Sequence, residues 1–264
     1  TAALRHDRTY LLGCGLVLLA GLVLSLGVFC IRGTGGSDAW QYLFWRAIGF
    51  TAALAMFAAI RQRINPVEQV RRLGRLAWIS AAAMAVSQAT FISSAKLTTF
   101  AEVFFICALA PLLAAVLARP LLGERIGRMG LIAIAIALVG VALMSGGGFA
   151  EGSWVGRGLA MISAISFAAY TLSTRGARGE DLDAALIVVG LLIMVVSFVA
   201  VQASGQPLAP SWRHIAIPML HGTVILSLGL VMVTSASISM SGPKSPGELG
   251  GSPFSYLERQ LVLT

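Results

Sequence analysis

The chain has 264 residues, of which 57% are apolar and only 11% are charged. Soluble domains contain about 45–50% apolar and about 25% charged residues, so this composition excludes a soluble enzyme, a disordered chain and a coiled coil. The mean hydropathy of +0.86 points in the same direction. The sequence therefore predicts a membrane protein.

Eight apolar stretches follow one another along the chain, and each has about the length that a helix needs to cross some 30 Å of hydrocarbon. They cover residues 10–31, 39–60, 76–95, 97–118, 129–145, 154–174, 184–203 and 215–237. Only three charged residues lie inside them, Arg46, Glu102 and Arg157. Spanning strands would alternate in polarity over about ten residues, and an open sheet would leave backbone groups unpaired in lipid. The expected fold is all-α, a polytopic transmembrane bundle of about eight helices.

The net charge of +8 is explained by membrane topology. With the N-terminus in the cytoplasm, 14 of the 19 lysines and arginines fall in cytoplasmic segments, four fall outside, and Arg46 lies within a span. Positive charge gathers in the cytoplasmic loops of helical membrane proteins. We therefore expect a multi-pass protein of the plasma (inner) membrane, with the lipid bilayer as a partner and no nucleic acid.

Signatures of enzymes such as HExxH, GxSxG, a Walker loop or a CxxC pair are missing. The three cysteines, Cys14, Cys30 and Cys107, lie inside predicted spans and indicate neither a disulfide nor a metal site. The first apolar stretch is longer than the apolar region of a signal peptide, which predicts a retained helix. We expect no catalytic role, no cofactor and no metal.

An internal repeat is indicated at an offset of 143 residues. Three features of the first half recur at this spacing: Gly15 as Gly158, Arg32–Gly33 as Arg175–Gly176, and Asp38 as Asp181. Because five spans lie within one offset, the two copies would cross the membrane in opposite directions. Inverted repeats of this kind are typical of secondary transporters.

The second copy is expected to be incomplete. Counterparts of the fourth and fifth spans would fall near residues 240–261 and beyond 272, but Pro243, Pro246 and Pro253 forbid a continuous helix there. The predicted organisation is a first five-helix repeat (1–147), a second repeat with three helices (148–240), and a Gly/Pro/Ser-rich tail that is disordered or aberrant (241–264). Such a chain would form a homo-oligomer or be unstable.

The segment from Phe91 to Met144 resembles a known family. It reads FISSAKLTTFAEVFFICALAPLLAAVLARPLLGERIGRMGLIAIAIALVGVALM, with a mid-helix proline and a closing LLGER. The residues of this motif are Pro111, Gly123, Glu124 and Arg125. The pattern resembles the EamA-type repeat of the drug/metabolite transporter superfamily, and the segments WRAIGF around Arg46 and GLAMISAISFAAYTLSTRG fit it too.

The resemblance covers roughly residues 10–237 and implies two inverted five-helix halves around a central substrate cavity. It also implies a carrier-type transporter that moves a small polar metabolite by alternating access. The chain departs from the family pattern in lacking a recognisable ninth and tenth helix. The alternative is therefore a non-transporting membrane protein, either a partner subunit or a truncated fragment.

Polar residues inside the spans are the candidates for a substrate pathway: Arg46, Gln88, Ser94, Glu102, Tyr170 and His221. A charge at the bilayer centre is costly, so Arg46 either holds an anionic substrate group, forms an internal ion pair, or extends to the outer membrane surface. Glu102 either binds a cation or a proton, or forms an ion pair with Lys96 or Arg46.

His221 is either a protonation switch or a buried neutral histidine bonded to a backbone carbonyl. Gln88, Ser94 and Tyr170 could offer hydrogen bonds to a substrate, but such groups also join helices to one another. Glu124 is expected to be a structural clamp at the cytoplasmic loop.

Overall fold

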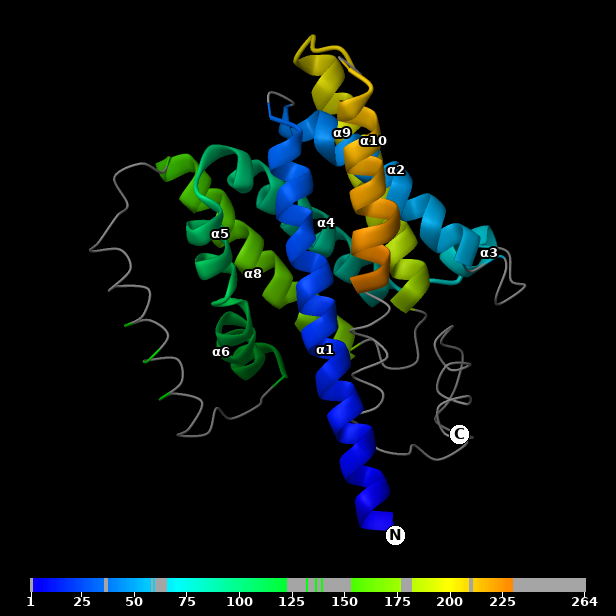
Figure 1. Cartoon of the computed structure of the whole chain (residues 1–264), viewed down its shortest axis with the longest axis vertical. Coiled ribbons are helices and arrows are strands. Elements are labelled where there is room, and N and C mark those ends of the chain that lie inside the picture. Colours follow the sequence, from blue (N-terminus) through cyan, green and yellow to red (C-terminus); the bar gives the residue numbers. More distant parts are fainter. Residues whose placement is uncertain are drawn as a thin grey trace. The chain divides into compact units, whose positions relative to one another are not determined.

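Helices account for all the regular secondary structure in the residues that the structure describes. The structure is a computed structural model, and it describes residues 2–35, 38–57, 59, 66–122, 132, 136, 139, 153–176, 182–208 and 211–229. The helices are α1 (Ala2–Gly33), α2 (Ala39–Phe57), α3 (Pro66–Arg71), α4 (Arg75–Leu97), α5 (Phe100–Cys107), α6 (Ala110–Leu122), α8 (Trp154–Gly176), α9 (Leu182–Ala203), α10 (Arg213–Leu220) and the π-helix η2 (His221–Leu226). The predicted all-α, polytopic bundle is confirmed (Figure 1).

Four helical segments are long and apolar enough to cross a membrane: Arg75–Leu97, Phe100–Ala118, Trp154–Thr174 and Ala184–Ala203. They coincide with the third, fourth, sixth and seventh predicted spans. α1 has 32 residues, which is about 48 Å at 1.5 Å per residue and longer than the hydrocarbon core. The LLGER residues Gly123, Glu124 and Arg125, the tail 241–264 and nearly all of the fifth predicted span lie outside the described residues.

The fourth predicted span, 97–118, is not one continuous helix. α5 ends at Cys107 and α6 begins at Ala110. Pro111 is therefore the second residue of α6, and the expectation of a mid-helix proline was wrong. Proline has no N–H to bond the carbonyl four residues earlier, and its ring clashes with that carbonyl, here that of Cys107. The helix break between Cys107 and Ala110 therefore lies where the proline ring would otherwise clash with the preceding turn.

The helices form two compact units. Unit 1 comprises Thr1–Leu73 and Asp181–Thr264, and unit 2 comprises Gly74–Glu180. Each unit combines helices from both predicted repeats, because unit 1 joins α1–α3 to α9, α10 and η2, and unit 2 joins α4–α6 to α8. The chain passes between the units only twice, at 73–74 and 180–181.

In unit 2, α4 and α8 pack antiparallel through small residues. The buried face of α8 repeats every four residues as Gly156, Ala160, Ala164, Ala168 and Leu172. The buried serines of α4 recur every seven residues as Ser80, Ser87 and Ser94. Small side chains allow helix backbones to approach closely, which is how helices associate in lipid.

Serine hydroxyls connect this helix pair. The Ser87 Oγ donates to the Ser163 carbonyl at 3.0 Å, and the Ser163 Oγ donates to the Ser87 carbonyl at 2.9 Å. About two turns further along α4, the Ser94 Oγ donates to the Gly156 carbonyl at 2.7 Å. The hydroxyls of Ser87, Ser163 and Ser94 are therefore paired across the interface.

In unit 1, α2 is the central helix and packs against both α9 and the α10–η2 segment. The rings of Phe44 and Phe198 lie 5.9 Å apart between α2 and α9. Glycines allow the approach of the other helices: a Cβ on Gly49 would lie 2.6 Å from the Met219 carbonyl oxygen, and a Cβ on Gly222 would overlap the Arg46 carbonyl.

Two glycines of α8 provide a matched test of this close packing. A Cβ on Gly156 would lie 2.9 Å from the Thr98 Cβ, whereas a Cβ on Gly158 would meet nothing within 4 Å. We expect Gly156→Ala to lower the free energy of unfolding by about 1–3 kcal/mol through overpacking. Gly158→Ala should leave it unchanged or raise it by up to about 1 kcal/mol, because alanine favours helix. Thermal unfolding of the full chain in detergent would measure both, and equal effects would contradict the packing.

Candidate functional site

In each unit, polar side chains gather around a buried ionisable residue, which is Glu102 in unit 2 and His221 in unit 1. The unit 2 cluster consists of Thr98, Thr99, Glu102 and Arg157, and the unit 1 cluster consists of Tyr42, Arg46 and His221. Arg46, Glu102 and His221 were predicted as pathway residues from the sequence, whereas Tyr42 and the threonines were not.

The unit 2 cluster forms where the chain leaves α4 and enters α5. Thr98 is extended, and Thr99 is the N-cap of α5, where its hydroxyl accepts a hydrogen bond from the Glu102 N–H. Threonine followed three residues later by glutamate is the sequence signature of a capped helix start. This signature, Thr99 to Glu102, places the carboxylate in the first turn of α5.

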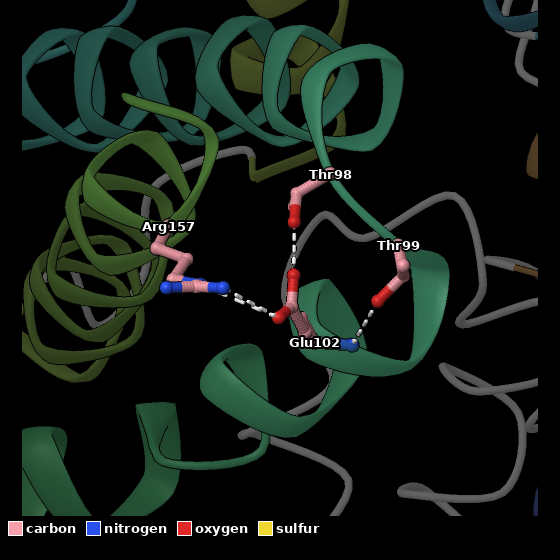
Figure 2. Close-up of polar contacts among 4 residues, drawn as sticks. All are labelled: Thr98, Thr99, Glu102 and Arg157. Atoms are coloured by element: carbon pink, nitrogen blue, oxygen red, sulfur yellow. Dashed lines mark hydrogen bonds and ion pairs between the residues drawn. The ribbon is translucent and has the colours of Figure 1, made fainter. Parts of the chain in front are cut away.

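The Glu102 carboxylate is held from both sides (Figure 2). Arg157 of α8 donates to its Oε1 from Nη2 at 3.1 Å and from Nε at 3.3 Å. The Thr98 hydroxyl donates to its Oε2. The side chains of Arg157 and Glu102 are only 11% and 9% exposed, so each charge is compensated inside the unit.

Arg157 also lies over the ring of an exposed tryptophan, Trp154. Its guanidinium lies 4.8 Å from the ring centroid of Trp154, whose side chain is 82% exposed. Tryptophan is enriched at membrane–water interfaces, and arginine over an aromatic face is a favourable cation–π contact. The cluster therefore joins the start of α8 to the α4–α5 connection at one end of unit 2.

Sequence reasoning expected Lys96 or Arg46 as the ion-pair partner of Glu102, and the structure instead pairs Glu102 with Arg157. The signal was present in the sequence, because Glu102 and Arg157 both lie near the ends of spans that are predicted to face outward. The two residues are 55 positions apart in the sequence, so the sequence alone did not indicate that they form an ion pair.

The unit 1 cluster is centred on His221. Its Nδ1 lies 2.5 Å from the hydroxyl of Tyr42 on α2, and the two side chains are 6% and 0% exposed. Arg46 is one helical turn further along α2 and is 4% exposed. The partner of His221 is thus a tyrosine hydroxyl and not the backbone carbonyl that the sequence reasoning weighed.

The backbone around His221 is irregular. Pro218 lies inside α10, and the chain continues from His221 as the π-helix η2. Short π-helical turns within α-helices frequently occur at functional sites. The imidazole lies against Gly27 of α1, where a Cβ would be 2.7 Å from Nε2.

The other predicted pathway residues lie along α4 and α8. Ser94 bonds the Gly156 carbonyl and so joins the two helices. Gln88 and Tyr170 are half-buried, and the Tyr170 ring lies 5.9 Å from that of Phe167. Within the described part of the chain, no group of three His, Cys, Asp or Glu residues could hold a metal ion.

The Glu102–Arg157 pair can be tested by a double-mutant cycle. E102Q or R157Q alone leaves a poorly solvated charge without its partner, and each should lower the free energy of unfolding by about 1–3 kcal/mol. The double variant E102Q/R157Q should lose less than the sum, with a coupling of about 0.5–3 kcal/mol. Thermal unfolding in lipid nanodiscs is the measurement.

The exposed pair of Glu68 and Arg72 on α3 is the matched control. Its side chains are 58% and 78% exposed, so E68Q should change stability by less than about 1 kcal/mol. Strictly additive losses for E102Q and R157Q would show that the two charges are not coupled.

Comparison with known proteins places the chain in a family. Residues 11–146, just over half of the chain, match the EamA-like transporter family. No curated protein matches the chain. A solved structure described only as the crystal structure of a protein superposes with a TM-score of 0.57 at 18% identity, covering 97% of this chain and 99% of that one, which shows a shared fold. The chain belongs to the EamA-like transporter family and is a multi-pass membrane protein.

Proposed function

We propose that the chain is a secondary transporter of the plasma (inner) membrane that moves a small polar metabolite by alternating access between two inverted repeats. Family membership supports the transporter class. The main support for the inverted arrangement is the packing register of two helix pairs, one in each unit. The facing residues of one pair correspond to those of the other, to within one helical turn, at the same offset of 143.

Facing residues of α4 and α8 in unit 2 have numbers that add to 250, as in Ser94 with Gly156 and Ser87 with Ser163. In a repeat with an offset of 143, the counterpart of an α4 residue lies 143 positions later, and the counterpart of an α8 residue lies 143 positions earlier. The counterparts of α4 and α8 are therefore the α10–η2 segment and α1. The numbers of facing residues in that pair should again add to 250.

The register of unit 1 agrees with this expectation. A Cβ on Gly33 of α1 would lie 3.8 Å from the Cδ1 of Ile217, and these two numbers add to 250. Two closer contacts between the same helices, Gly27 with His221 and Gly229 with Leu24, add to 248 and 253, within one helical turn of that register. Helix boundaries recur at the same offset, because α1 ends at Gly33 and α8 at Gly176. α2 and α9 likewise begin 143 residues apart. Sequence and packing thus support the same repeat.

The two compact units are the bodies that would move against each other. Both connections between them, at 73–74 and 180–181, lie in segments predicted to be cytoplasmic. Rocking of one helical bundle against another is a common form of alternating access.

Reporter fusions or cysteine labelling would test the orientation. We expect the segment 62–75 to be cytoplasmic, because it contains four arginines against one glutamate, and we expect the segment 146–153, with no basic residue, to be outside. Labelling of full-length variants with a membrane-impermeant thiol reagent in intact cells should modify a cysteine in 146–153 and spare one in 62–75. The reverse pattern for both would contradict the orientation.

Uptake by the full chain in liposomes would test transport. Labelled amino acids, nucleotide sugars and vitamins form the panel, and we expect saturable uptake of at least one compound above protein-free liposomes. Because a charged residue within a span usually serves function, Arg46→Gln should lower that uptake at least about tenfold, which corresponds to about 1.4 kcal/mol.

Arg213→Gln, which changes an exposed arginine at the start of α10, is the matched control and should keep near-normal uptake. Absence of uptake of every compound would favour the alternative that the chain is a non-transporting membrane protein, such as a partner subunit.

A further inference from the structure

Two helices of unit 1, α1 and α2, pack against the His221 imidazole. The Tyr42 hydroxyl of α2 meets its Nδ1 at 2.5 Å, and Gly27 of α1 provides the space next to its Nε2. The following residue, Gly222, packs directly on the Arg46 carbonyl. In this closed arrangement, His221 is only 6% exposed.

The backbone that carries His221 is suited to rearrangement. Pro218 removes one helical hydrogen bond, and the π-helix η2 follows. Side-chain hydroxyls bond several carbonyls here: the Thr223 Oγ1 donates to the Met219 carbonyl at 2.7 Å, and the Ser227 Oγ donates to the Gly222 carbonyl at 3.1 Å. Because these hydroxyls can follow their carbonyls, the segment can change its helical geometry without leaving backbone groups unpaired.

The charges around His221 are basic or neutral. The titratable and charged groups on the packed helices are Tyr42 and Arg46 on α2, Cys30 and Arg32 on α1, and Arg213 and His214 on α10. No carboxylate occurs among the described side chains of α1, α2, α10 and η2. A proton on His221 would therefore add a positive charge to the same low-dielectric region as Arg46.

Protonation of His221 is consequently linked to separation of the helices that pack around it. A second positive charge is costly while Tyr42 closes the site, and it becomes less costly once water or an anionic solute enters. A proton that binds better to the open state must shift the population towards that state, and opening must by reciprocity favour the proton.

We propose that His221 is the proton-binding site of the carrier and that the Tyr42–His221 contact controls its access to water. This inference rests on the proposed transport function and names its coupling ion. A proton from water on one side forms an N–H bond at the imidazole nitrogen that lacks a hydrogen. After the helices rearrange, that bond breaks and the proton passes to water on the other side, with no other covalent change.

Hydrogen–deuterium exchange at the histidine C2 position, followed by mass spectrometry, tests the site without a substrate. The full chain in nanodiscs is measured from pH 5 to pH 9. We expect the exchange rate of His221 to follow a titration curve, as it does for an imidazole that reaches its protonated form. Tyr42→Phe should raise the rate several-fold, because the closing contact is lost.

Trp45→Phe is the matched control. It removes another hydrogen bond of α2, from the Trp45 Nε1 to the Leu208 carbonyl at 2.9 Å, and it should leave the exchange of His221 unchanged. A slow rate at every pH in both the unaltered chain and Tyr42→Phe would overturn the proposal, because His221 would then be a permanently closed structural residue.

Liposomes separate this inference from the proposed function. The probe is the labelled compound of the panel that the unaltered chain takes up most strongly. An inward gradient of one pH unit can drive about tenfold accumulation for one proton per substrate. His221→Asn should lose this response and keep exchange of labelled for unlabelled probe across the membrane, which also shows that the variant is folded.

Uptake by His221→Asn that still responds to the gradient would overturn the assignment to His221 alone. No uptake by the unaltered chain would contradict the transport function, and the exchange measurement would still decide whether His221 binds a proton.

Discussion

Helices in lipid must attract each other without a hydrophobic driving force, and in this protein close backbone approach provides the attraction. Glycine, alanine and serine form the buried seams in both units, from Gly156 and Ala160 on α8 to Gly222 on η2. The positions of the polar groups depend on these seams. The missing side chain of Gly156 leaves room for Thr98, which in turn donates to Glu102. Gly27 in the same way leaves room for the imidazole of His221.

The proposed repeat relates the scaffold of the two halves but not their chemistry. At an offset of 143, Arg157 corresponds to Cys14, and the span that contains Glu102 has no predicted counterpart, so the ion pair is not repeated. His221 corresponds to Trp78, and Tyr42 to Ala185. Two inverted halves with identical chemistry would give outward-open and inward-open states of equal free energy. In the proposed carrier, charges and a histidine that occur in one half only would make the free energies of the two states unequal.

The sequence predicted the class and most of the spans, because charge depletion over some 20 residues has few explanations other than a membrane helix. It also contained the Thr99–Glu102 capping signal and the proline that divides α5 from α6. The hydrogen-bond and ion-pair partners of the polar residues could not be predicted in the same way. Arg157 and Tyr42 come from helices far along the chain, and their pairing depends on helix rotation and register. Tyr42, near the start of a span, fits the pattern of an interfacial aromatic residue equally well.

The two polar clusters differ in the number of hydrogen bonds that their central side chains form. This difference suggests different roles for the two clusters. Both oxygens of Glu102 accept hydrogen bonds, and Arg157 also lies over Trp154. A fully satisfied buried network rigidifies its surroundings, so unit 2 has the character of a fixed body. Among the described residues, His221 makes one side-chain hydrogen bond, to Tyr42, within an irregular helix. A single bond at a deformable segment can open and close without dismantling a network. In the proposed carrier, the cluster of unit 1 is therefore the one whose chemistry can change during a transport cycle, and the cluster of unit 2 holds its own helices in place.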